Sequence, residues 1–175
     1  KTNEPEDIIF LSRLQDDLER QGGWKTRVQI EALVETPLAI VNAYRIATAS
    51  DRMVGLIFGI ADFAATVAVR EIVDDQNKNF HYAKQAVVVS AKAAGLHAID
   101  NAYLRLIRKD TSPAEAKQIE EGLRRKNMEA ASLGMDGTWV IYPHQAEIAN
   151  ECYTPNDEEI ERLVTFGSWT EPIEG

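Results

Sequence analysis

VQIEALVETP (residues 28–37) and VGLIFGIADF (residues 54–63) are two short apolar runs, and each ends beside a carboxylate, Glu35 in the first and Asp62 in the second. A stretch with helical spacing lies between them, so the order is strand, acid, helix, strand, acid. In a parallel α/β sheet this order brings both carboxylates to the carboxyl edge, where such folds build their active sites. Two hard oxygen ligands on rigid strand ends suit Mg²⁺, and Mn²⁺ is also possible.

The composition is that of one globular domain. The chain has 175 residues, of which 45% are hydrophobic and 27% charged, enough for a real core. No apolar run approaches the ~18 residues that would span a membrane, and no signal-peptide pattern opens the chain. Cys152 is the single cysteine, so an internal disulfide is impossible and we expect a reducing, cytoplasmic location.

The charge balance argues against nucleic acid as a partner. The formal net charge is −9, from 28 acidic and 19 basic residues, whereas non-specific binding to phosphate backbones needs a positive surface. The basic residues are scattered apart from Arg124, Arg125 and Lys126. We expect this trio to form a solvated helix face.

The remaining elements follow from apolar periodicity and from helix start and stop signals. Thr36 with Pro37 and Ser112 with Pro113 are helix starts, and Gly95 is a helix end. The pattern predicts helices over 5–20, 37–49, 63–69, 80–94, 113–133 and 155–166, strands over 27–34, 54–58, 98–99 and 138–141, and a loop over 74–79.

This alternation of strands and helices predicts an α/β fold with a parallel sheet and right-handed crossovers. We find no repeat or linker, so residues 1–175 are expected to form a single domain. Four strands do not close a barrel by themselves. The chain is therefore either a small open sheet or a piece of a larger barrel.

Several ordered motifs resemble one family, the citrate lyase β-subunit-like superfamily, which includes malyl-CoA and citramalyl-CoA lyases and is related to the HpcH/HpaI aldolases. The resemblance runs from about residue 25 to residue 168. The motifs are IEALVETPL (30–38), IATAS (46–50), FGIADF (58–63), AAGLHAID (93–100), LGMDGTWVIYPHQ (133–145) and YTP (153–155).

The resemblance implies a TIM (β/α)8 barrel of which this chain holds about strands 5–8, with residues 1–4 at the end of the fourth strand. The family's amino-terminal half and carboxyl-terminal lid are then not present. The implied activity is the retro-Claisen or aldol cleavage of a 3-hydroxyacyl-CoA to an acyl-CoA and an oxo acid. The implied assembly is a homo-oligomer, a trimer or hexamer.

The resemblance also assigns roles to residues. Glu35 and Asp62 match the family's two Mg²⁺ ligands, whereas the catalytic arginine lies outside this chain, so the catalytic residues here stay unknown. Thr36 is an N-cap beside the substrate, and Pro37 and Leu38 resemble the stretch that packs under substrate. Two further residues are substrate-binding candidates: Gly59, which allows close backbone approach, and Asp100, which either faces substrate or CoA or stabilises a turn.

Other candidates keep a structural interpretation. Glu31 shares the strand parity of Glu35 and is expected to be structural or to support the ligands. Tyr142 stands where the family usually has histidine, and His144, close to it, is the histidine to test. Cys152 has no identifiable base partner and is expected in the core or an interface.

Three alternatives stay open. A pyruvate-type class II aldolase uses a similar acid pair, although the segment 139–145 favours the acyl-CoA branch. A malyl-CoA thioesterase of the same superfamily is compatible with the same residues. A non-catalytic half-barrel that needs a partner chain is the third.

Overall fold

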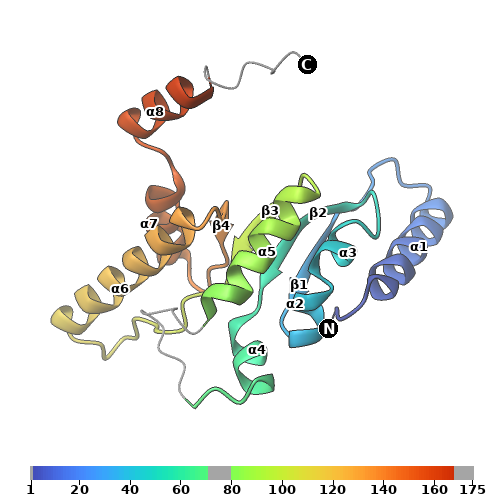
Figure 1. Ribbon diagram of the computed structural model, residues 1–175. Helices are drawn as coiled ribbons and strands as arrows, with labels where there is room; N and C mark the ends of the chain where they lie inside the picture. Colours follow the sequence, from blue (N-terminus) through green and yellow to red (C-terminus); the bar gives the residue numbers. More distant parts are fainter. Residues whose placement is uncertain (1, 71–79, 168–175) are drawn as a thin grey trace.

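The computed structural model describes residues 2–70 and 80–167, and within them a four-stranded parallel sheet lies in the order β1-β2-β3-β4 (Figure 1). The strands are β1 Ile30–Val34, β2 Met53–Phe58, β3 His97–Asp100 and β4 Gly137–Thr138. The helices are α1 Pro5–Gly22, α2 Pro37–Val41, α3 Ala43–Ala47, α4 Ile60–Thr66, α5 His81–Ala93, α6 Pro113–Ser132, α7 Pro143–Tyr153 and α8 Asp157–Gly167. The expected loop over 74–79 lies outside the described residues.

One face of the sheet carries the main core, and helices α3 and α5 pack on it. The buried residues of this face are Ala32, Val34, Leu56, Phe58 and Ala98. Because side chains alternate along a strand, the next position on each strand points to the opposite face. There Leu33, Ile57 and Ile99 form one row in register across three strands.

The start and stop signals act as expected. Thr36 Oγ1 accepts a hydrogen bond from Ala39 N at 3.1 Å and so caps α2. Gly95 adopts φ 71° after α5, and Ser112 Oγ accepts from Glu115 N at 3.3 Å to start α6. The helix expected over 37–49 is instead two short helices that meet at Asn42.

The expected strand over 138–141 is wrong beyond Thr138. Trp139 N still donates to Asp100 O at 3.0 Å, but β4 is the edge of the described sheet and has no strand on its other side. The amides of Ile141 and Tyr142 turn instead to Gln145 Oε1, which accepts from both.

This turn starts helix α7, which the sequence pattern did not predict. Tyr142 is the N-cap, Pro143 takes the first helical position and Gln145 closes a capping box. These signals are present in the sequence, directly after the apolar run 139–141 that favours a strand. The last helix is also shorter than expected and begins at Asp157 rather than at 155.

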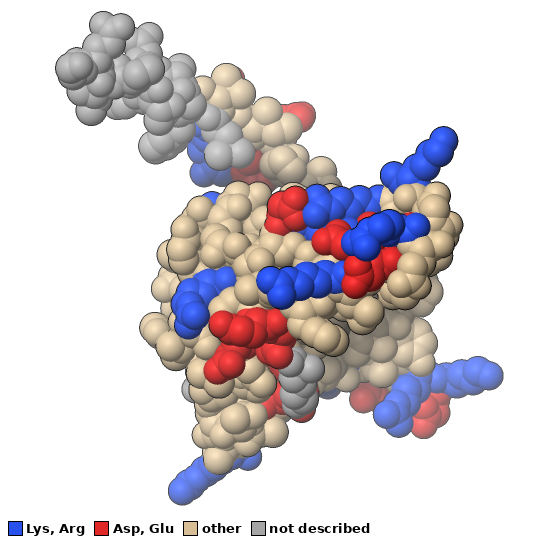
Figure 2. Space-filling view, turned by 90° about the vertical axis from the view of Figure 1, so that its right-hand side faces the viewer, with Lys and Arg blue, Asp and Glu red and all other residues tan. Residues whose placement is uncertain are grey.

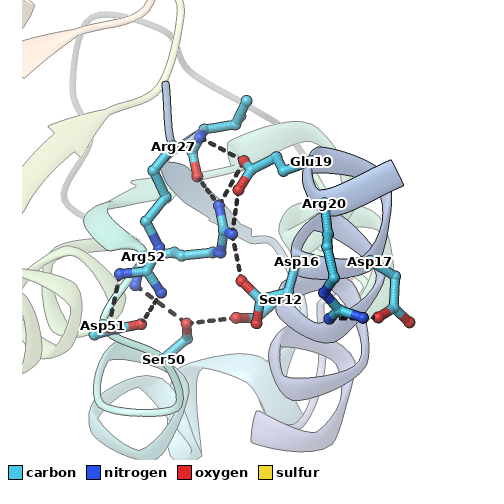
Figure 3. A network of polar contacts seen from close by, with 10 residues as sticks. Ser12, Asp16, Asp17, Glu19, Arg20, Arg27, Ser50, Asp51 and Arg52 are labelled. Atoms are coloured by element: carbon cyan, nitrogen blue, oxygen red, sulfur yellow. Dashed lines mark hydrogen bonds and ion pairs between the residues drawn. The ribbon is translucent and has the colours of Figure 1, made fainter. Parts of the chain in front are cut away.

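Arg52 joins α1 to the amino end of β2 through hydrogen bonds and ion pairs (Figure 3). Its buried guanidinium donates to Glu19 Oε1 at 2.8 Å, to Glu19 Oε2 at 2.6 Å and to Val28 O at 2.8 Å, and it pairs with Asp16. The hydrogen bond from Arg52 lowers the pKa of Glu19 to about 2. A second contact, Ser12 Oγ to Ser50 Oγ at 2.9 Å, joins the same two segments.

The outer surface on the α1 side mixes charges of both signs, with Lys and Arg interspersed among Asp and Glu (Figure 2). This face therefore offers no continuous basic surface to a phosphate backbone. Among the helices of residues 2–70 and 80–167, none has the length and apolar character that crossing a bilayer requires.

We predict that Arg52→Met lowers the free energy of unfolding by about 2 kcal/mol or more, because it leaves the Glu19 carboxylate without its buried partner. Urea denaturation followed by circular dichroism measures the change. Arg20→Met is the matched control, since Arg20 and Asp17 form an exposed pair and its removal should cost less than about 1 kcal/mol. Equal losses of unfolding free energy in the two variants would show that the contacts of Arg52 stabilise the fold no more than the exposed pair of Arg20 and Asp17 does.

Candidate functional site

Glu35 directly follows β1 and lies against the backbone of Gly59, the residue after β2. The side chain is 8% exposed. Gly59 N donates to Val34 O at 2.9 Å, which brings the end of β2 beside Glu35. A Cβ at Gly59 would lie 2.5 Å from Glu35 Cβ and 3.0 Å from Glu35 Oε2, so only glycine fits beneath this carboxylate.

Asp62 lies one turn beyond Gly59, in the first turn of α4, and it is partly exposed. The helix expected over 63–69 therefore begins earlier, at Ile60, and Asp62, which was expected at the end of a strand, lies inside it. The reason is that Gly59 itself serves as the N-cap of α4. Glu35 and Asp62 nevertheless share the carboxyl edge of two adjacent parallel strands.

The number and type of ligands that these two carboxylates offer determine which metal ion they fit. Within residues 2–70 and 80–167, no group of three His, Cys, Asp or Glu side chains is placed to hold a metal ion. A pair of carboxylates fits Mg²⁺ or Mn²⁺, which commonly keep waters or substrate oxygens in their remaining positions. The pair does not fit a structural zinc site, which needs four protein ligands.

Residues 36–38, the segment after Glu35, already make contacts within the chain. Thr36 Oγ1 donates to Asn3 Oδ1 at 2.6 Å in addition to capping α2, so the single proton of this hydroxyl is already used. Pro37 takes the first helical position. Leu38 is 49% exposed, whereas Thr36 and Pro37 are partly buried, so Leu38 offers the most surface to a ligand.

Asp100, at the end of β3, is completely buried and faces the helix layer. Lys84 Nζ of α5 lies 2.7 Å from Asp100 Oδ1, and Lys126 Nζ of α6 lies 3.0 Å from Asp100 Oδ2. Of the two roles expected for Asp100, these contacts support the stabilising one. A carboxylate with no exposed surface and two ammonium partners is not presented to a substrate.

Lys126 corrects the expectation of a solvated trio, because its side chain is completely buried. Its Nζ also donates to Asn101 O and, at 2.6 Å, to Thr138 Oγ1. Burial lowers the pKa of Lys126 to about 8, with Asp100 opposing this shift and Lys84 adding to it. One signal was available in the sequence: Lys126 falls three residues after Leu123 and four before Ala130, on the buried stripe of α6.

The remaining candidates are dispersed. Glu31 is exposed, in register with Gly55 and His97 on the face opposite the main core. His144 is partly buried in α7, and its ring centroid lies 6.0 Å from that of Tyr142. Cys152 is partly buried near the end of α7, and burial raises the pKa of its thiol.

A family model described as HpcH/HpaI aldolase/citrate lyase matches residues 1–143. The chain belongs to this family. The match includes both carboxylates at the sheet edge and continues to the first residue of α7.

Relatives of known name are lyases. The chain is 28% identical over 169 residues to L-malyl-CoA/β-methylmalyl-CoA lyase of Rhodobacter capsulatus, which covers 88% of this chain and 50% of the relative. It is 32% identical over 151 residues to citrate lyase subunit β of Leuconostoc mesenteroides subsp. cremoris, and this match covers 86% of this chain and 46% of the relative. The chain thus spans about half the length of the curated relatives it matches.

Solved structures give the same fold. A citrate lyase from Burkholderia xenovorans superposes with a TM-score of 0.79 at 21% identity, covering 97% of this chain and 53% of that one. The citrate lyase β subunit of Mycobacterium tuberculosis, complexed with oxaloacetate and magnesium, gives 0.64 at 25% identity, covering 89% and 59%. The expected fold class is confirmed: α/β, with about strands 5–8 of a TIM barrel.

We predict that Gly59→Ala lowers the free energy of unfolding by about 1–3 kcal/mol, because the new methyl group would displace Glu35. Gly137→Ala is the control, since nothing lies within 4 Å of the position of its added Cβ. Urea denaturation of both variants measures the difference. A Gly59→Ala protein as stable as Gly137→Ala would show that Glu35 does not lean over Gly59.

The buried Lys126 gives a second prediction, on pH. Between pH 8 and its ordinary pKa of 10.5, Lys126 keeps its proton in the unfolded chain and loses it in the folded one. The free energy of unfolding therefore increases as the pH rises through this range. The gain is about 1.4 kcal/mol for each unit of pKa difference. Urea denaturation from pH 7 to pH 10.5 should show this rise in wild type and in the exposed-site control Lys117→Met, and lose it in Lys126→Met. A Lys126→Met curve parallel to that of wild type would contradict the lowered pKa.

Proposed function

We propose that the protein containing this chain is a Mg²⁺-dependent carbon–carbon lyase, which cleaves a 3-hydroxyacyl-CoA of the malyl-CoA or citramalyl-CoA type into an acyl-CoA and an oxo acid. One observation carries the proposal: Glu35 leans over Gly59, and Asp62 follows one turn later at the same sheet edge. The names of the relatives support it, including mitochondrial citramalyl-CoA lyase of Mus musculus at 38% identity over 106 residues.

Glu35 and Asp62 are the proposed metal ligands. Solved relatives from Mycobacterium tuberculosis contain magnesium with oxaloacetate, or magnesium with acetoacetate and coenzyme A. When bound, Mg²⁺ or Mn²⁺ would supply a Lewis acid and a template for the carboxylate and adjacent oxygen of the oxo acid. Glu35 would hold its side of the site rigidly, because the backbone of Gly59 fills the space beneath it.

The bonds that break and the charge that develops in this cleavage determine which further groups the site needs. The C2–C3 bond breaks as the substrate hydroxyl loses its proton and becomes the carbonyl of the oxo acid. The electron pair of that bond passes to the acyl-CoA fragment as a thioester enolate, which then takes up a proton. Positive charge beside the thioester oxygen stabilises the enolate, and we assign this role to residues outside the present chain.

The substrate would lie over the carboxyl ends of β1 and β2. Leu38 offers apolar surface beside Glu35, and Pro37 fixes the direction in which α2 leaves the strand. Thr36 acts through α2, whose first turn it caps, and Gly59 allows close approach. Asp100 is removed from the substrate-binding set and acts as a buried anchor instead.

We further propose that residues 1–175 form the carboxyl-terminal half of a barrel. In the described sheet β1 and β4 are the outer strands, and parallel sheets of this kind close with eight. Four further strands between β4 and β1 would complete the site and supply the enolate-stabilising cation. The complete protein is then expected to be a homo-oligomer, a trimer or hexamer.

The test is an assay of malyl-CoA, citramalyl-CoA and citryl-CoA cleavage with Mg²⁺ present and removed. Asp62→Asn and Glu35→Gln should each lower kcat/KM by about a hundredfold or more, because each removes one of two metal-ligand charges. Glu31→Gln is the matched control, an exposed carboxylate of β1, the strand that Glu35 follows, and should stay within about threefold of wild type.

Two results would contradict the proposal. Release of free CoA and malate with no oxo acid would identify a thioesterase. Cleavage of a free 4-hydroxy-2-oxo acid, without action on any CoA thioester, would identify the aldolase branch.

A further inference from the structure

A cavity lies between α8 and the carboxyl ends of α6 and α7. Its volume is about 530 Å³, and sites for small molecules commonly measure about 300–1,000 Å³. Figure 1 shows α8 beyond the end of α7 and away from the sheet, so the cavity has α8 on one side and the body of the fold on the other. The space is therefore large enough to hold a small molecule.

The cavity lies at the amino edge of the sheet. Asp136, in its wall, directly precedes β4, and Ala131 and Cys152 lie near the carboxyl ends of the two helices on either side of β4 in the chain. The amino edge of a (β/α) fold usually serves stability alone, but here α8 adds a space beside it. Because Glu35 and Asp62 lie at the opposite edge, a ligand in the cavity would not contact them.

Most of the cavity wall is apolar, and the packing of the fold holds it in place. Met135 is 4% exposed and belongs to the main core, and Tyr153 packs against that core. Cys152 packs against the second buried cluster, which joins α6 and α7. The apolar wall is completed by Ala131 and Pro155. A ligand with an apolar body would therefore remove a preformed apolar surface from water.

The two acids that line the cavity already have partners. Asp136 Oδ2 accepts a hydrogen bond from Ala98 N at 2.8 Å, and Asp136 Oδ1 pairs with Lys92 Nζ. Glu159 Oε2 accepts from Asn156 N at 2.9 Å, in the first turn of α8. Neither carboxylate is therefore left to recognise a cationic ligand.

Arg162 of α8 is the charged group of the cavity wall that remains available. It is exposed, and over residues 2–70 and 80–167 no carboxylate oxygen lies within 4.0 Å of its guanidinium nitrogens. A guanidinium group offers paired N–H donors that match the two oxygens of a carboxylate. Because Asp136 and Glu159 outnumber Arg162, charge alone does not attract an anion, and the ligand must also have an apolar body.

We propose that this cavity binds a small carboxylic acid with an aliphatic chain. The carboxylate would pair with Arg162, and the chain would lie on Met135 and Tyr153. Such a ligand contacts both α8 and the core, so its binding would hold α8 against the body of the fold. The proposal does not depend on the proposed lyase activity, since the cavity and the candidate metal site lie at opposite edges of the sheet.

The first test is binding of hexanoate to the purified protein by isothermal titration calorimetry. Acetate, which lacks the chain, and 1-hexanol, which lacks the charge, should each bind at least about tenfold more weakly. Arg162→Gln should weaken hexanoate binding by about tenfold, because it removes a charge-assisted hydrogen bond. Arg13→Gln, an exposed arginine of α1, is the matched control and should bind like wild type. Equal binding of hexanoate by Arg162→Gln and wild type, or of hexanoate and acetate by wild type, would overturn the proposal.

The second test fills the cavity. Ala131→Leu adds a side chain at a partly buried position of its wall and should abolish hexanoate binding. Ala93→Leu is the matched control, because Ala93 is an exposed alanine near the end of another helix, α5. Hexanoate bound equally well by the two variants would overturn the proposal.

The third test locates the bound ligand through Cys152, the single cysteine of this chain. At a hexanoate concentration of about ten times the Kd, alkylation of Cys152 by N-ethylmaleimide, followed by peptide mass spectrometry, should slow by about tenfold. The protection should persist in EDTA and in Asp62→Asn, because neither change reaches the cavity. An unchanged rate of alkylation, or protection lost when Mg²⁺ is removed, would place hexanoate elsewhere and overturn the proposal.

Discussion

The ion cluster of Lys84, Asp100 and Lys126 joins four elements that are far apart in sequence, α5, β3, α6 and β4. Removing three charges from water is costly, and only close mutual contact offsets the loss. Asp100 supplies one negative charge for two ammonium groups, which is why Lys126 also needs Asn101 O and Thr138 Oγ1. The same contacts fix the carboxyl ends of β3 and β4, and β3 is the strand beside β2 at the sheet edge that carries the candidate site.

The two ends of the sheet use polar contacts for different purposes. At the amino end, Arg52 joins α1 to β2 through Glu19 and Asp16, and every partner is engaged within the network (Figure 3). At the carboxyl end, Leu38 beside Glu35 keeps surface available to a ligand. This division follows the general rule for (β/α) folds, in which the amino end of the strands stabilises and the carboxyl end binds and reacts.

Signals that act on neighbouring residues predicted much of this fold. Contacts between residues far apart in the chain could not be predicted in the same way. Thr36, Gly95 and Ser112 act on their immediate neighbours, so their roles could be predicted from a few residues of context. Glu35 and Asp62 were found because each follows an apolar run, although the entry of Asp62 into α4 depends on Gly59 acting as an N-cap. The burial of Lys126 depends on Asp100, 26 residues earlier in the chain, and no local pattern identifies that partner. Segment 139–141 is apolar enough for a strand, but a strand also needs neighbours to pair with.

The proposed function requires that Glu35 and Asp62 bind one divalent cation together over Gly59. Crystals of the protein soaked in Mn²⁺ give the most direct measurement, because Mn²⁺ replaces Mg²⁺ in oxygen sites and its anomalous signal locates it without reference to activity. We expect a single strong peak within about 2.5 Å of a carboxylate oxygen of each residue, which disappears in Asp62→Asn. A peak bound by only one of the two residues, or its persistence in Asp62→Asn, would show that the two carboxylates do not share a cation.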